Sequence, residues 1–190
     1  LKDQWLQDRW TWGRRAKSNA EDISAITKAM AGVEQDAAAL EDEARRGWTF
    51  KPTGPLSDAV TTAEPIHMQI GAHLVRTHRG LADGQCGEFM VGSVAGLKII
   101  LTRYIYINII VQGRSRSYTL DRTGTHIQSA EQTGQKVMEC LELLMQESGR
   151  LIQQVQRMER ENRDIEQRLA LGFEHEEKLQ AQMRRPYLPV

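Results

Sequence analysis

The sequence lacks the features that would assign the chain to a membrane or secreted class. No segment approaches the roughly 18 consecutive apolar residues that a membrane-spanning helix requires. Near the N-terminus Lys2, Asp3 and Asp8 interrupt the apolar core that a signal peptide would need. The 25 basic and 25 acidic residues cancel, so the net charge indicates no class of partner. We therefore expect a cytoplasmic protein that does not contact a membrane.

Cysteine and aromatic residues are also scarce. The two cysteines, Cys86 and Cys140, fall in different predicted elements and form no CxxC motif, which predicts reduced thiols rather than a disulfide. Aromatic residues make up 6% of the chain and hydrophobic residues 40%. This composition is typical of an elongated helical protein, in which each helix buries only one stripe, and it indicates a thin core.

The first strong pattern lies in an N-terminal arm, residues 1–47. Its apolar residues recur at alternating spacings of three and four, which is the heptad pattern that keeps one stripe of a helix facing a partner helix. Gly47 follows the last of them and predicts a glycine cap at the end of this helix. The seam consists of Trp5, Trp12, Ala16, Ile23, Ile26, Met30, Val33, Ala37, Leu40 and Ala44, with Arg9 and Asn19 in its two gaps.

The C-terminal part, residues 123–190, is more regular still. From Ile127 to Leu169 the same spacing continues without a slip, which predicts one continuous helix of about 43 residues and then a short terminal helix. Ser148 and Asn162 are polar positions in this seam that would fix its register. The two seams cover each other as an antiparallel pair within the chain, or a homodimer forms through the coiled coil. Periodicity does not separate these alternatives.

Between the helical parts, residues 48–122 predict a small head that contains a β-sheet. Alternating apolar residues and turn signals predict three antiparallel strands. A short helix is expected to cover the apolar face, because so small a sheet is not stable alone. The predicted strands are Phe89–Leu101, Tyr104–Val111 and Ser115–Leu120, the turns are Thr102–Arg103 and Gln112–Arg114, and the helix is Glu64–Leu81.

The middle strand predicts which face of the sheet is covered. One face is uniformly apolar, with Ile105, Ile107, Ile109 and Val111. The opposite face is mixed and carries tyrosine hydroxyls that need water or a partner. The predicted fold is therefore α+β: a long coiled-coil stalk that carries a three-stranded antiparallel sheet and one short covering helix.

No group of residues has the spacing of a catalytic or metal site. His73 and His78 are five residues apart, so they do not share a helical face as an i, i+4 metal pair would. His175 has acidic neighbours that radiate from a helix rather than converge on one ion. Cys86 lies in a turn but lacks the surrounding motif of an activated nucleophile. We expect a protein without enzymatic activity, cofactor or metal; a Cys86–histidine pair is the enzymatic alternative.

Arginine residues on the head are better candidates for a binding site. Residues 73–122 contain seven basic and three acidic residues, which gives +4 on a chain that is neutral overall. Arginine and exposed aromatic side chains bind phosphates and stacked bases, and they also anchor protein interfaces. A solvated strand edge that is protected by charge is the alternative. The candidates are Arg103, Arg114, Arg116, Tyr118 and Arg122.

A second candidate surface lies in the N-terminal arm. Trp10 falls off the heptad seam and has Arg14 and Arg15 close by in the sequence. An exposed tryptophan beside arginines is typical of a docking surface or an oligomer contact. Burial of this tryptophan against the C-terminal helix is the alternative.

The order of these segments resembles a known family. A helix with AEPIHMQIGAHLVR precedes VGSVAGLKIIL, the aromatic strand YIYINIIV, YTLD, a helix with GTHIQSAEQTGQKVMECLELL and finally FEHEEKLQAQM. Over roughly residues 23–185 this order resembles the C-terminal region of large phage and plasmid proteins that join an adenine DNA methyltransferase to a superfamily-two helicase, the antirestriction-type or strawberry-notch-like proteins. Val94 and Leu97 stand where that family has aromatic residues.

The resemblance implies an accessory role and carries over no catalytic residue. The sequence has no phosphate-binding loop, helicase acidic box or amino-methyltransferase motif. We expect a protein-interaction module of mobile-element origin, an accessory or counter-defence factor that acts on a host or phage nucleic-acid-processing complex. The alternative is a nucleic-acid-binding accessory domain that places the arginine-rich hairpin on phosphates. The two differ in salt dependence, because only phosphate binding weakens steeply with ionic strength.

Overall fold

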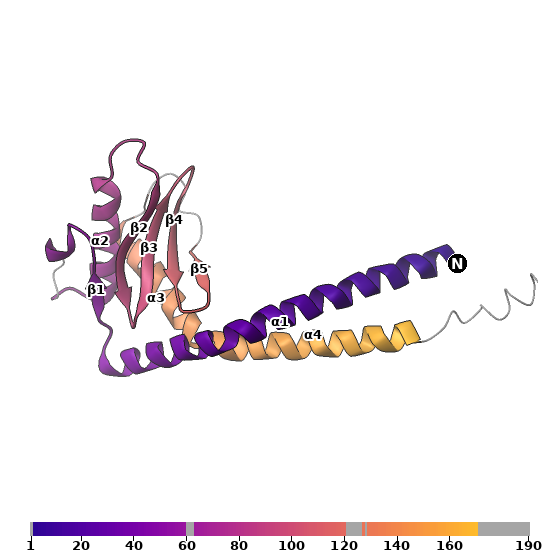
Figure 1. The fold of residues 1–190 in the computed structure, drawn as a ribbon. Coiled ribbons are helices and arrows are strands. Elements are labelled where there is room, and N and C mark those ends of the chain that lie inside the picture. The colour runs from indigo at the N-terminus through magenta and orange to yellow at the C-terminus, as the bar shows by residue number, and fades with distance from the viewer. Residues whose placement is uncertain (1, 60–62, 121–126, 128, 171–190) are drawn as a thin grey trace, which may run out of the picture. The chain divides into compact units, whose positions relative to one another are not determined.

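The computed structural model describes residues 2–59, 63–120, 127 and 129–170, and shows an α+β chain (Figure 1). The described residues divide into two compact units: a helical unit, which includes residues 2–27 and 152–170, and a sheet unit, Lys28–Leu151. The elements are α1 (Lys2–Arg46), β1 (Phe50–Pro52), the 3-10 helix η1 (Ser57–Ala59), α2 (Ile66–Gly80), β2 (Gly87–Val94), β3 (Leu97–Arg103), β4 (Ile107–Gln112), β5 (Ser117–Thr119), α3 (Ala130–Met145) and α4 (Glu147–Ala170).

In the helical unit, α1 and α4 pair within the chain and run antiparallel. The guanidinium of Arg168 lies 5.8 Å from the ring centroid of Trp12, whereas Asn19, further along α1, contacts Asn162, which comes earlier in α4. The amide of Asn19 donates to the Asn162 side-chain oxygen at 3.0 Å. The two helices are therefore antiparallel, because the contacts move towards the start of α4 as they move along α1. Asn162, a predicted polar position of the seam, contributes a hydrogen bond between the helices.

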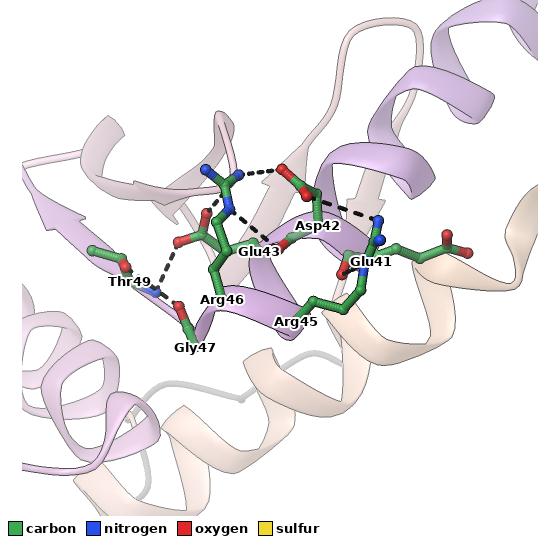
Figure 2. Close-up of polar contacts among 7 residues, drawn as sticks. All are labelled: Glu41, Asp42, Glu43, Arg45, Arg46, Gly47 and Thr49. Atoms are coloured by element: carbon green, nitrogen blue, oxygen red, sulfur yellow. Dashed lines mark hydrogen bonds and ion pairs between the residues drawn. The ribbon is translucent and has the colours of Figure 1, made fainter.

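The C-terminal end of α1 lies where the sequence predicts it (Figure 2). Gly47 follows the helix with φ of +93°, a left-handed conformation that glycine adopts without strain. Within the last turn Arg46 pairs with Asp42. The Glu43 carboxylate reaches beyond the helix and accepts a hydrogen bond from the backbone N–H of Thr49 at 3.0 Å. The predicted glycine cap is therefore confirmed.

The prediction of a three-stranded sheet is wrong. The sheet has five strands in the order β1-β2-β3-β4-β5, and every neighbouring pair is antiparallel. The predicted first strand, Phe89–Leu101, is divided between two strands, because Val94 pairs with Leu97 across the two-residue turn Ala95–Gly96. Both turn residues have positive φ, +51° and +84°, as a type I′ turn requires. Alanine rarely adopts such a conformation, so no turn was expected at this point.

The predicted turn at Thr102–Arg103 is also wrong. Strand β3 continues through Arg103, which pairs with Ile107, so the chain reverses over the three residues between them. Ile105 is one of these three, and its side chain is 82% exposed. It therefore does not share the covered face of the sheet with Ile107, as the strict alternation had predicted.

Two helices, rather than the one predicted, cover the apolar face of the sheet (Figure 1). Helix α2 contributes Ile70 and Leu74, and α3 contributes Val137 and Leu141, to one core with the inward side chains of the strands. Because α3 packs against α2 and the sheet, its part of the C-terminal seam faces the core of the sheet unit. The strand side chains in this core are Val91, Val94, Leu97, Ile99, Leu101, Ile107, Ile109 and Val111.

The single 43-residue C-terminal helix is likewise corrected. The chain forms two helices, α3 and α4, which are separated at Gln146 with φ of −99° and ψ of −3°. The backbone N–H of Gln146 bonds to the carbonyls of Leu143 and Leu144, which tightens the last turn of α3. Helix α3 begins at Ala130, where the hydroxyl of Ser129 caps it. The predicted terminal helix lies outside the described residues.

Within the described ranges, none of the helices combines the length and the apolar character that crossing a bilayer requires.

Candidate protein-interaction surfaces

The hairpin turn between β4 and β5, Gly113–Arg116, is called the arginine turn below. It packs against α1 through Asp36, whose carboxylate accepts a hydrogen bond from the backbone N–H of Arg114 at 2.8 Å and another from its guanidinium at 2.7 Å. Ser115 adds a hydrogen bond from its hydroxyl to the carbonyl of Ala29 at 2.8 Å. The Asp36 side chain is buried, and these two hydrogen bonds compensate the charge of its carboxylate.

The second arginine of the turn is also engaged. Arg116 lies 3.4 Å from the Glu147 carboxylate at the start of α4, and Arg150 approaches the other oxygen of that carboxylate at 3.4 Å. Each arginine of the turn therefore faces a buried carboxylate of its own chain. A phosphate that approached Arg114 or Arg116 would compete with Asp36 or Glu147, which weakens the case for this turn as a nucleic-acid site.

Three further sequence candidates belong to the sheet unit. Tyr118 is half-buried on the covered side of β5, and burial, followed by the nearby Glu147 carboxylate, raises the pKa of its phenol. Its ring is therefore part of the core packing rather than an open stacking platform. Arg103 donates from its guanidinium to the carbonyl oxygen of Ala82 at 3.5 Å. Arg122 lies outside the described residues.

The N-terminal candidates lie on α1 in the helical unit. Trp10 is 62% exposed, and the guanidinium of Arg14 lies 4.5 Å from its ring centroid. Arg15 forms an ion pair with Glu161 at 2.9 Å. Hydrogen bonding to Arg15, followed by that to Asn19, lowers the pKa of the Glu161 carboxylate. The structure thus brings Trp10 and Arg14 together on the surface, whereas Arg15 connects α1 to α4.

Three exposed apolar side chains of the sheet unit lie together at a position that the sequence did not single out. The aromatic tip, Tyr104–Ile105–Tyr106, joins β3 to β4, and a hydrogen bond from the Tyr104 N–H to the Tyr106 carbonyl at 3.2 Å closes it. Ile105 is 82% exposed and Tyr104 is 61% exposed. The turn predicted at Thr102–Arg103 hid this feature, because it made YIY the first three residues of the strand Tyr104–Val111. The sequence did indicate one related feature, namely that the tyrosine hydroxyls of this segment need water or a partner.

The structure places one histidine and two cysteines that the sequence offers for chemistry. His73 is fully buried, with its Nε2 atom 3.0 Å from the carbonyl oxygen of Thr53 and its ring against Phe50. Cys86, its proposed partner in a catalytic pair, is exposed. Burial raises the pKa of Cys140 to about 11, so that thiol remains protonated near neutral pH. Among the described residues, no cluster of three or more His, Cys, Asp or Glu side chains has the arrangement of a metal site.

A groove beside strand β5 is a further surface feature of the sheet unit. It encloses about 360 Å³ between β5 and the outer side of α3, within the sheet unit. Leu143, in the last turn of α3, borders it and is 66% exposed. The lining residues are Tyr118, Thr119, Leu120, Lys136, Glu139, Cys140, Leu143, Leu144, Glu147 and Arg150.

Comparison with models of protein families, with curated proteins and with solved structures finds no significant match to this chain.

Proposed function

We propose that this chain is a non-enzymatic protein-interaction module and that the aromatic tip is its principal contact. The supporting observation is the exposure of Ile105 between two tyrosines at the end of a hairpin. Tyrosine is among the residues that most often form the anchors of protein interfaces. The Ile105 side chain is held on a short hairpin, so it loses little conformational entropy on binding. The tip is held between two strands whose neighbouring residues, Arg103 and Ile107, are paired.

The resemblance to antirestriction-type proteins supplies the proposed setting. In that setting the module is of phage or plasmid origin, acts in the cytoplasm, and binds a component of a host or phage nucleic-acid-processing or defence complex. It acts as an accessory or counter-defence factor. This part of the proposal rests on the order of the sequence segments alone.

The protein-contact proposal is tested with two baits in parallel. Wild-type chain and a variant with Tyr104→Ser, Ile105→Ser and Tyr106→Ser are immobilised at equal density and exposed to lysate of the source host at about 150 mM and 500 mM salt. A direct partner is retained by the wild type at both concentrations, because apolar anchoring is insensitive to salt, and is lost by the variant. Its purified form must then bind the wild type at least about tenfold more tightly than the variant. Equal binding of both baits contradicts the proposal.

Nucleic-acid binding through the arginine turn is the second candidate. Its support is the +4 charge of residues 73–122, and the ion pairs of Arg114 and Arg116 with Asp36 and Glu147 weigh against it. Fluorescence anisotropy with duplex and single-stranded DNA at about 50 mM and 200 mM salt measures it directly. Binding that falls steeply with salt and is lost in the Arg114→Glu/Arg116→Glu variant would favour this candidate over the protein contact. An absence of binding at the lower salt concentration would remove it.

A further inference from the structure

Strand β5 is the last strand of the sheet formed by the described residues, and one of its edges faces β4. The carbonyl of Arg116 accepts a hydrogen bond from the N–H of Gly113 at 2.9 Å, and the N–H of Leu120 donates to the carbonyl of Ile109 at 2.8 Å. Residues 116, 118 and 120 therefore direct their amide groups towards β4. By the alternation of an antiparallel strand, Ser117 and Thr119 direct their N–H and C=O groups away from the sheet.

The side chains of β5 alternate in the same way. Tyr118 lies opposite Val111, which is buried on the helix-covered face, so Tyr118 and Leu120 point towards α3. Beyond them lies the β5 groove, about 360 Å³ in volume, with the exposed Leu143 on its α3 side. Thr119 itself lines this groove, so the outward amide groups at Thr119 lie beside it.

The charges that line the β5 groove balance one another. Glu147 has Arg116 and Arg150 at 3.4 Å on its two oxygens. The two other charged residues in the lining, Lys136 and Glu139, have opposite signs and are three positions apart on α3, where side chains are neighbours. A groove of this kind offers no excess charge to a phosphate or a highly charged peptide. It matches an uncharged apolar side chain.

We propose that the β5 edge and the β5 groove bind an extended peptide of a partner protein, which adds a sixth strand to the sheet. Residues of the peptide opposite Ser117 and Thr119 form the backbone hydrogen bonds. The peptide residue between them lies opposite Tyr118, and its side chain falls on the same face, into the groove against Leu143. The backbone bonds provide sequence-independent affinity, and the groove selects an apolar residue at this one position. This surface does not include the aromatic tip, and the proposal does not depend on the tip's function.

The test uses the full chain, labelled with ¹⁵N, and a defined probe: a synthetic ten-residue peptide in which leucine alternates with threonine between lysine ends. The control probe has proline at its central positions and so lacks the amide donors of a strand. We expect saturable NMR shifts at Ser117–Thr119 and Leu143 with the first probe, slower amide exchange at Ser117 and Thr119, and neither effect with the control. Shifts confined to other residues, or the absence of saturation at about millimolar peptide, would overturn the proposal.

Two variants and two controls make the test specific. Thr119→Pro removes only an outward N–H and leaves the bonds to β4 intact, so it weakens probe binding about tenfold, whereas Thr119→Val keeps that N–H and binds normally. Leu143→Ser, an exposed substitution on α3, also weakens binding about tenfold. The triple serine variant of the aromatic tip binds the probe like the wild type, so failure here is distinguishable from failure of the tip. Unchanged affinity of Thr119→Pro would contradict the proposal.

A second copy of this chain is the competing occupant of the edge. Sedimentation velocity of the wild type and of Thr119→Pro separates the two. A monomeric wild type that binds the probe supports the peptide proposal. A wild-type dimer that Thr119→Pro converts to a monomer overturns it, since the edge is then occupied by β5 of another copy.

Discussion

Gly71 and Gly134 face each other where α2 and α3 pack together in the sheet unit. A Cβ atom on Gly71 would overlap the backbone carbonyl of Ala130, and one on Gly134 would overlap the carbonyl of His67. Each glycine thus lies against the backbone of the opposite helix rather than against a flexible side chain. This close approach sets the distance between the two helices that cover the sheet. Gly134 lies on the predicted C-terminal seam, whereas Gly71 was not recognised in the sequence as a packing residue.

Substitution of either glycine tests this contact. Gly71→Ala and Gly134→Ala should each lower the free energy of unfolding by about 3 kcal/mol, because the helices must separate to admit the new methyl group. Equilibrium urea unfolding of the full chain, followed by circular dichroism, measures the change.

Gly149→Ala is the matched control, since this helical glycine in α4 has open space around the position of its Cβ. It should raise the free energy of unfolding by about 0.5–1 kcal/mol through helix propensity alone. If Gly71→Ala behaves like Gly149→Ala, the two helices do not approach as closely as described.

The Asp36 carboxylate is predicted to contribute more to stability than its arginine partner. Asp36→Ala leaves the part-buried N–H of Arg114 without its acceptor and should cost about 1–3 kcal/mol. Arg114→Gln keeps the backbone hydrogen bond and removes a half-exposed ion pair, so it should cost less than about 1 kcal/mol. Thermal unfolding of both variants gives the comparison. Equal losses would show that the ion pair, and not the backbone contact, holds the arginine turn on α1.

The hydrogen bond between Asn19 and Asn162 predicts coupling between α1 and α4 in the helical unit. Asn19→Ala should cost about 1–2 kcal/mol, because Asn19 is buried and its amide serves both Asn162 and Glu161. In a double-mutant cycle with Asn162→Ala, the interaction energy should be about 0.5–1.5 kcal/mol. Additive losses in the cycle would mean that the two amides act independently.

The pKa shift of Glu161 predicts an acid dependence of the helical unit. Its pKa is lowered in the folded chain by Arg15 and Asn19, so its carboxylate stabilises the fold above its ordinary pKa of about 4.3. That contribution is lost as the pH falls through the lowered pKa. Thermal unfolding between about pH 6 and pH 3 should therefore depend less on pH in Glu161→Gln than in the wild type. The exposed Glu159→Gln serves as the control and should follow the wild-type curve.

Periodicity predicted the parts of the fold that depend on local pattern. The heptad seam of the arm and the Gly47 cap both follow from residues close together in the sequence, as does the buried alternation of Ile107, Ile109 and Val111 in β4. These features can be predicted without the rest of the chain, because the spacing of apolar residues determines which side chains share one helix stripe or one strand face.

The errors arose where distant contacts override local preference. Gln146 carries no helix-breaking signal, and the neighbouring Glu147 is held by Arg116 from a strand hairpin 31 residues earlier. Ala95 adopts a positive φ because its hairpin demands it. The ion pair between Arg114 and Asp36 joins residues 78 positions apart, so the arginines appeared available in the sequence although both are engaged in the structure. The aromatic tip was missed because the turn was predicted at Thr102–Arg103, whereas the chain reverses at Tyr104–Tyr106.

The arginine turn has a consequence for the order in which the chain can fold. It holds Asp36 through Arg114 and Glu147 through Arg116, so one four-residue segment contacts both α1 and α4, which the strands of the sheet separate in the sequence. During synthesis the arm is made long before residue 147, so its apolar seam stays uncovered until α4 is present. Closing so long a loop is slow unless the intervening strands have already formed. The chain therefore depends on the sheet unit as its folding nucleus, and the unpaired arm is exposed to aggregation or to chaperones until α4 has formed.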